Sequence, residues 1–204
     1  MMLFLQMNYL AHAFLSFNNS DILAGNMISD FVKGKAQFNY PPGIQKGIQL
    51  HRFIDEFTDT HPVTAKAKSF FRPQYRLYSG AFTDVVYDHF LALDTKRFEE
   101  YQNIENFSKN VYQLLENNFL HFPPHFQKML PYMKEQNWLY NYQYKEGIQK
   151  GFQGIVYRAA YLNESIVAYE IFNQYYDELK NCYEEFFPEL MEFAHKKLSN
   201  LLAD

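Results

Sequence analysis

Apolar residues recur at three- and four-residue intervals along almost the whole of this 204-residue chain. That spacing gathers them on one face of an α-helix, whereas a half-buried strand needs alternation, which is scarce and short here. The pattern therefore predicts an all-α fold, a helical bundle. To within about two to four residues at each end, we expect helices over residues 8–17, 21–33, 42–57, 62–71, 76–94, 96–118, 124–136, 141–161 and 164–201.

Prolines fall where helices should begin, as at Pro41-Pro42 and Pro62. Inside the last expected helix, Pro188 could kink the helix or split it in two, because proline lacks the backbone N–H that a helix interior uses. No linker, repeat or low-complexity tract divides the chain. We therefore expect a single domain over residues 1–204.

The composition is that of a globular protein, with 48% hydrophobic and 21% charged residues. Cys182 is the single cysteine, so an internal disulfide is excluded and a cytoplasmic location is the default. The first twenty residues carry no charged side chain, but they lack the basic start of a signal peptide. Asn8, His12 and Ser16 would form one polar stripe, which favours an internal helix over a membrane span. No feature sets an oligomeric state.

Charge is distributed unevenly along the chain. The net charge of −4 argues against nucleic-acid binding by bulk charge. Residues 33–76 nevertheless contain eight basic and three acidic residues, whereas residues 160–204 contain three basic and nine acidic residues. Two interpretations remain open, namely solvated faces of ordinary helices or a basic docking surface for an acidic partner.

Polar residues that can bind metals recur four positions apart on four expected helices. Such residues share one helix face, although any single pair is weak evidence. Asp84 and Asp88 are notable because they lie in AFTDVVYDHFLAL, where a solvated face would hold more charge. The pairs are Asn8 with His12, Asn26 with Asp30, His51 with Asp55 and Asp59, and Asp84 with Asp88, which His89 follows directly.

Several buried carboxylates need a compensating positive charge, because desolvation and mutual repulsion both disfavour their charged forms. A divalent cation would supply it. Imidazole with carboxylate suits Mn, Fe or Zn, and an all-oxygen shell suits Mg or Ca. The structural alternative is a buried ion-pair network in which Arg52 and lysines balance Asp30, Asp55 and Asp84. Spacing alone leaves both open.

Signatures of other site classes are absent from the sequence. It contains no G-x-x-x-x-G-K-[ST], G-x-G-x-x-G, G-x-S-x-G, H-E-x-x-H or paired C-x-x-C motif. Cys182 has no obvious histidine partner, so a thiol nucleophile is not expected.

An ordered series of motifs resembles the acyl carrier protein phosphodiesterase family, also called acyl carrier protein hydrolase. The motifs are MNYLAHAFLS (7–16), LAGNMISDFVKG (23–34), PPGIQKGIQLHRFIDEFTDTHP (41–62), FTDVVYDHFLA (82–92) and, at the end, FFPELMEFA (186–194). One departure is visible, because the family usually has an aromatic residue soon after DHFLA and Leu93-Asp94-Thr95 supplies none.

The resemblance implies an all-α enzyme distantly related to the HD metal-dependent phosphohydrolases. Such an enzyme removes the 4′-phosphopantetheine arm from holo acyl carrier protein by cutting the phosphodiester to a carrier serine. Its metal is typically Mn²⁺, with Mg²⁺ and Fe²⁺ as alternatives. The matching positions are Asn8, His12, Asn26, Asp30, His51, Arg52, Asp55, Asp59, Asp84, Asp88 and His89.

These positions receive expected roles. The metal ligands should come from Asp30, His51, Asp55, Asp84 and Asp88. In catalysis, Arg52 could neutralise a phosphate oxygen. His89 or His12 could protonate the leaving serine oxygen. We expect Asn8, Asn26, Lys66 and Arg72 to bind the substrate. Lys66 and Arg72 belong to the basic segment, which would steer an acidic carrier protein. The alternatives are an HD-like hydrolase of another phosphoester, such as a nucleotide, or a non-catalytic helical module that binds carrier protein.

Overall fold

The computed structural model describes residues 8–203, and every regular element among them is a helix. The all-α prediction is confirmed; Met7, which opens the first motif, lies outside the described residues. The α-helices are α1 (Tyr9–Phe14), α2 (Ser20–Ile28), α3 (Pro42–Thr60), α4 (Pro62–Tyr75), α5 (Ser79–Leu93), α6 (Ile104–Asn117), α7 (Pro124–Glu135), α8 (Trp138–Asn141), α9 (Lys145–Arg158), α10 (Ile166–Gln174) and α11 (Tyr176–Ala203). Short 3₁₀ segments are η1 (Ser29–Phe31), η2 (Gly34–Asn39), η3 (Arg76–Tyr78), η4 (Thr95–Tyr101) and η5 (Phe119–His121).

The last helical segment breaks at a different place from the predicted one. The chain leaves helical geometry between α10 and α11, at Tyr175, and continues as helix through Pro188. Phe186 and Phe187 are almost fully buried just before this proline. Their packing favours a continuous helix and offsets the missing N–H bond. The expected helix over residues 96–118 is also divided in the structure. The segment η4 ends at Tyr101, and α6 begins at Ile104, after its N-cap Asn103.

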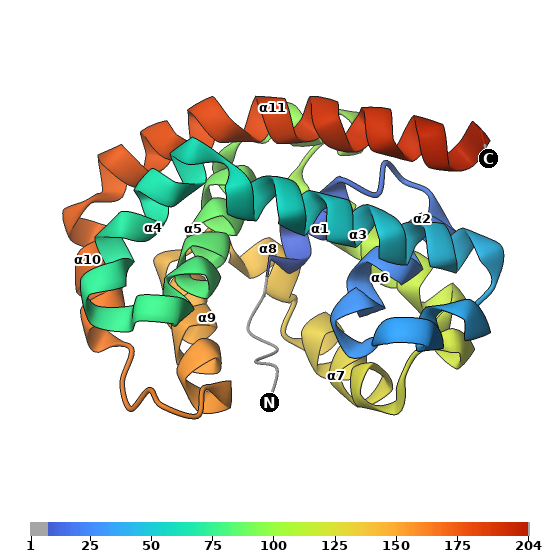
Figure 1. The fold of residues 1–204 in the computed structure, drawn as a ribbon, viewed down its shortest axis with the longest axis horizontal. Helices are drawn as coiled ribbons and strands as arrows, with labels where there is room; N and C mark the ends of the chain where they lie inside the picture. The colour runs from blue at the N-terminus through green and yellow to red at the C-terminus, as the bar shows by residue number, and fades with distance from the viewer. Residues whose placement is uncertain (1–7, 204) are drawn as a thin grey trace.

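The helices surround one continuous apolar core that extends from α1 to α11. In Figure 1, α11 runs along one side of the molecule above α3, α4 and α5, while α7 and α9 lie on the opposite side. The short helix α1 lies in the middle, between these two sides. Residues carried by α1 are therefore surrounded by other helices. In the described part of the chain, no helix combines the length and apolar character that crossing a membrane requires.

Helices α2 and α3 cross at two glycines that permit backbone contact. A Cβ atom on Gly25 would collide with the Ile44 carbonyl oxygen, and one on Gly47 would collide with the Ile22 carbonyl oxygen. No side chain larger than hydrogen fits between the two backbones here. The close crossing brings Asn26 on α2 within hydrogen-bonding distance of His51 on α3.

Candidate metal centre and active site

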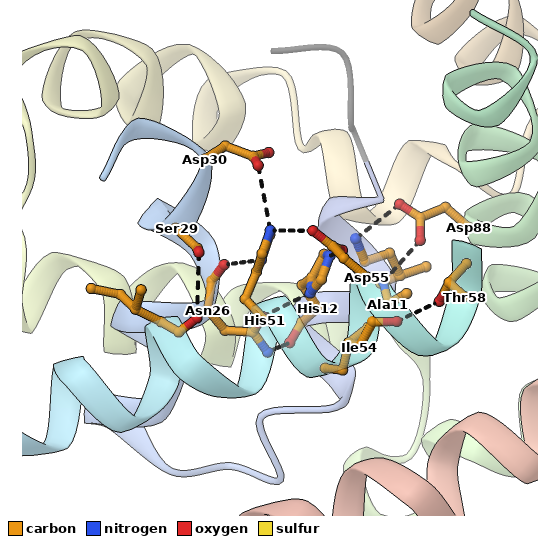
Figure 2. A network of polar contacts seen from close by, with 12 residues as sticks. Ala11, His12, Asn26, Ser29, Asp30, His51, Ile54, Asp55, Thr58 and Asp88 are labelled. Carbon is orange, nitrogen blue, oxygen red and sulfur yellow. Dashed lines mark hydrogen bonds and ion pairs between the residues drawn. The ribbon is translucent and has the colours of Figure 1, made fainter. Parts of the chain in front are cut away.

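Three polar side chains from α1 and α3 converge in the interior of the protein (Figure 2). His12 Nε2 lies 3.3 Å from Asp55 Oδ1, and His51 Nε2 lies 3.1 Å from Asp55 Oδ2. The two imidazole rings stack with their centroids 3.9 Å apart. Donor atoms bound to one ion at about 2.0–2.2 Å would lie about 3.0–3.5 Å apart. The separations of His12, His51 and Asp55 therefore match those of ligands around a single cation.

Asn26 determines the tautomer of both imidazole rings. Its side-chain nitrogen donates to the His12 carbonyl oxygen at 2.9 Å, which identifies the other amide atom, Oδ1, as an acceptor. His12 Nδ1 lies 2.7 Å from this Oδ1, and His51 Nδ1 lies 2.7 Å from the Asn26 carbonyl oxygen. Both Nδ1 atoms must therefore carry hydrogen and donate it. The Nε2 lone pairs of neutral rings then point toward Asp55.

Buried atoms in this cluster lack partners. His12 Nε2, His51 Nε2 and Asp55 Oδ1 are buried without a hydrogen bond to the described residues, although they lie within ion-pair distance of one another. Lone pairs on nitrogen and carboxylate oxygen repel each other unless a positive charge lies between them. A proton on His51 Nε2 would remove the repulsion between His51 and Asp55. The repulsion between His12 Nε2 and Asp55 Oδ1 would remain. The donor set thus fits a divalent cation held by two imidazoles and one carboxylate.

The pKa shifts reflect the same competition for positive charge. Burial opposes protonation of His51, but Asp55 and Asp30 outweigh it and raise the His51 pKa to about 10. Burial and the neighbouring His51 lower the pKa of His12. Burial disfavours the charged form of Asp55, but the two histidines outweigh it and lower the Asp55 pKa. Asp55 is therefore a carboxylate at neutral pH, and His12 is a neutral ring.

Asp30 stands on the more open side of the cluster. Its Oδ1 lies 3.4 Å from His51 Nε2, and its side chain is 25% exposed, compared with 5% for His51. In Figure 2 it approaches His51 from η1, away from α1. Asp30 is thus placed to act as a further ligand or to face an incoming substrate.

Asp84 and Asp88 lie on α5 and are both buried. Asp88 Oδ2 and Oδ1 accept the backbone N–H groups of Leu10 and Ala11 at 3.0 and 2.8 Å, so this carboxylate holds the start of α1 (Figure 2). Asp84 makes no hydrogen bond or ion pair with the described residues. Burial, followed by the charge of Asp55, raises the Asp84 pKa well above its usual range. Of the two, Asp84 is the one that lacks another structural partner.

Some residues expected at the site point elsewhere. His89 follows Asp88 directly and therefore turns about 100° away on α5; its ring nitrogens contact the Tyr142 carbonyl oxygen and the Tyr176 hydroxyl at 2.7 and 3.1 Å. Arg52 is exposed and donates to Gln37 Oε1 at 2.7 Å. The structure therefore does not bring His89 or Arg52 to the cluster.

The residues expected to bind substrate divide into two groups. Asn8, just before α1, and Asn26 are buried, and Asn26 is fully used in holding the two rings. Lys66 and Arg72 are exposed on α4. Asn26 therefore positions the two imidazole rings, an arrangement that its four-residue spacing from Asp30 did not reveal.

A basic pocket of about 380 Å³ adjoins the end of α4 and is lined by Asp59, Lys68, Arg72, Arg76, Leu77, Ser79 and Gly80. Asp59 pairs with Lys68 at 2.6 Å and is exposed, so it does not join the buried cluster. Lys68 is nevertheless close enough to Asp84 to lower its pKa, against the larger effect of burial. The pocket therefore lies within electrostatic reach of the candidate metal centre.

Comparison with known proteins identifies the family of the chain. A sequence model described as Acyl carrier protein phosphodiesterase matches residues 7–190. A protein of that name from Yersinia pestis is 32% identical over 94% of this chain and 99% of its own length, and one from Klebsiella pneumoniae (strain 342) is 31% identical over the same shares. No solved structure matches the chain significantly. The chain belongs to the acyl carrier protein phosphodiesterase family.

Proposed function

We propose that this enzyme is a divalent-metal-dependent phosphodiesterase that releases 4′-phosphopantetheine from holo acyl carrier protein. The observation that carries the proposal is the convergence of His12 Nε2, which has no hydrogen-bond partner among the described residues, with His51 Nε2 on Asp55. Hydrolysis of a phosphodiester requires an activated water and neutralisation of phosphate charge. A bound divalent cation supplies both, because it lowers the pKa of a coordinated water and polarises a phosphoryl oxygen. Mixed nitrogen and oxygen donors suit Mn²⁺, Fe²⁺ or Zn²⁺, and the family resemblance favours Mn²⁺.

The residues of the chain would share the work as follows. His12, His51 and Asp55 hold the cation, and Asn26 keeps both rings in the tautomer that binding needs. Asp30 stands at the more exposed edge, where it can orient a water or complete the ligand set. Asp84 adds a buried carboxylate whose charge the cation would compensate. Asp88 acts indirectly, because it fixes the helix that carries His12.

The basic pocket at the end of α4 would receive the carrier protein. Lys68, Arg72 and Arg76 supply positive charge, and Leu77 beside them is 94% exposed. Acyl carrier proteins are acidic, so complementary charges would speed the encounter and orient the partner. Lys66, exposed on the same helix, would extend this surface.

Hydrolysis can be tested directly with purified protein, holo acyl carrier protein and Mn²⁺. Mass spectrometry should show the carrier losing the mass of the 4′-phosphopantetheine arm, and a chelator should abolish the loss. Asp55→Asn should reduce turnover by at least about a hundredfold, because removing a ligand removes the activated water. Asp177→Asn, an exposed carboxylate on α11, serves as the matched control and should keep normal turnover. An unchanged carrier mass with several divalent metals would refute the proposal, and turnover of a nucleotide instead would favour a different phosphoester.

A further inference from the structure

A second concave site lies along α9. It is a pocket of about 230 Å³ between α8 and α9, lined by Gln136, Trp138, Asn141, Tyr142, Gly147, Lys150, Gly151, Gly154 and Arg158. Gly147 and Gly151 allow α9 to approach the end of α8 and Val85 on α5, respectively. Together with Gly154 they contribute only backbone atoms to the lining of the pocket.

The charged groups that line the pocket are all positive. Lys150 and Arg158 are exposed, and neither pairs with a carboxylate in the described part of the chain. The remaining polar groups are amides and a phenol, and the apolar surface comes from Trp138 and the glycines. Trp138 is fixed because its indole N–H donates to Gln136 Oε1 at 3.0 Å. The pocket thus suits an anionic ligand that also has an uncharged, amide-containing part.

The pocket is connected to the metal centre through α1. The Trp138 ring lies 6.5 Å from the ring of Tyr9, the first residue of α1. Tyr142 lies close enough to Asp88, the carboxylate that holds the start of α1, to lower the Asp88 pKa against the larger effect of burial. Although the Arg158 residue as a whole is exposed, partial desolvation of its guanidinium group lowers its pKa, and nearby Tyr9, Tyr142 and Asp30 oppose that shift. Arg158 therefore lies within electrostatic reach of the exposed edge of the metal centre.

The length of the pocket can be compared with that of the substrate arm. From Gly147 to Arg158, α9 advances about 16 Å at 1.5 Å per residue. Extended chains with amide bonds advance about 3.4 Å per three bonds, so the arm, roughly four such units long, extends about 14 Å. A cavity of about 230 Å³ falls below the ~300–1,000 Å³ range of sites for bulkier ligands. The stretch of α9 that lines the pocket is therefore about as long as the arm, and the small volume favours a slender ligand over a bulky one.

We propose that the pocket between α8 and α9 binds the pantetheine arm of the substrate, with Arg158 contacting its phosphate and Trp138 packing against its far end. This inference rests on the proposed function and deepens it, because it names the residues that select the arm. The phosphate would lie between Arg158 and the metal centre, and the arm would run along the glycine face of α9. The two amides of the arm would meet the amide side chains of Gln136 and Asn141.

Trp138 is the single tryptophan of the chain, so its fluorescence reports on this pocket alone. The full-length protein is titrated with 4′-phosphopantetheine and, separately, with unphosphorylated pantetheine, and the change in emission gives a dissociation constant for each. Both compounds should change the emission in a saturable manner. In Arg158→Gln the dissociation constant for 4′-phosphopantetheine should rise at least about tenfold, because a charge-assisted contact is lost. The constant for pantetheine should change less than about twofold, since it carries no phosphate.

Lys196→Gln, which removes an exposed charge on α11, is the matched control and should leave both constants unchanged. Unaltered 4′-phosphopantetheine binding in Arg158→Gln would overturn the inference, as would no saturable change of emission or binding of adenosine monophosphate as tight as that of 4′-phosphopantetheine. The readout requires no turnover. Hydrolysis of holo carrier protein without arm binding at Trp138 would therefore contradict this inference alone, whereas arm binding without hydrolysis would contradict the proposed function alone.

Discussion

At the scale of single residues, Asn26 has the widest influence on the site. Its side chain fixes the His12 ring and its backbone carbonyl fixes the His51 ring, while Asn26 itself is fully buried. Partners of this kind orient metal ligands and raise their basicity. A residue with no access to substrate thus controls how both imidazoles present their free nitrogen atoms.

The shifted pKa of His51 predicts how metal binding depends on pH. In the metal-free protein Asp55 and Asp30 raise this pKa to about 10, against the effect of burial, so Nε2 holds a proton at neutral pH. A metal must displace that proton, so its affinity should rise roughly tenfold per pH unit between pH 7 and 9. Calorimetry of Mn²⁺ binding in buffers of different protonation enthalpy measures both the affinity and the protons released. A constant affinity over this range, without proton release, would argue against His51 as a ligand.

Sequence reasoning found the residues of the cluster better than their roles. The four-residue spacing of His51 and Asp55 predicted that the two side chains share one helix face. In the structure they lie on the same face of α3, within ion-pair distance of each other. Such spacing could not reveal that Asp88 would meet the amide groups of α1, because this contact joins segments 77 and 78 residues apart. The direction of His89 depends on how α5 is rotated against its neighbours, which single-helix periodicity does not determine.

At the scale of helices, the crossing of α2 and α3 positions the site. Replacing Gly47 with Ala would force a methyl group against the Ile22 carbonyl oxygen and push the helices apart. We expect Gly47→Ala to lower the free energy of unfolding by about 1–3 kcal/mol, the usual cost of overpacking, and to weaken metal binding because Asn26 would move away from His51. Chemical denaturation and metal titration measure the two effects.

The control for this substitution is Gly80→Ala, on the first turn of α5. A Cβ atom there would lie 3.4 Å from Lys68 Cε, which is an ordinary contact with a flexible side chain. Stability should be unchanged or slightly higher, because alanine favours helix more than glycine does. Equal stability of Gly47→Ala and Gly80→Ala would contradict the role given to the crossing.

Helix boundaries show where local signals are sufficient. Prolines at Pro42 and Pro62 mark helix starts in the structure as they do in the sequence. Pro188 does not split the helix, because the buried aromatic residues beside it stabilise α11 through tertiary packing. The tyrosine-rich run 139–147 contributes Asn141, Tyr142 and Gly147 to the pocket between α8 and α9. Its concave shape arises from how α8 and α9 meet, and no local pattern encodes that.

At the scale of the whole molecule, the uneven charge predicts how the carrier protein would be captured. Reversing Lys66 and Arg72 to Glu should raise KM at least about tenfold at low salt and change kcat less than about twofold, because these side chains act on encounter and not on the bond cleaved. Added salt should reduce the difference, since the Debye length falls to about 8 Å at 0.15 M. Steady-state kinetics at several salt concentrations measure this. Reversal of Lys180 and Lys196 on α11 is the control, and an equal rise in KM there would assign the effect to net charge.

The position of α11 has a practical consequence for such measurements. This helix ends the described chain at one extremity of the molecule, on the side opposite α7 and α9 (Figure 1). An affinity tag fused after α11 would anchor the enzyme to a sensor chip by the end of the molecule that is remote from α4, which carries the basic pocket (Figure 1). Immobilised enzyme should then meet the carrier protein without obstruction from the support.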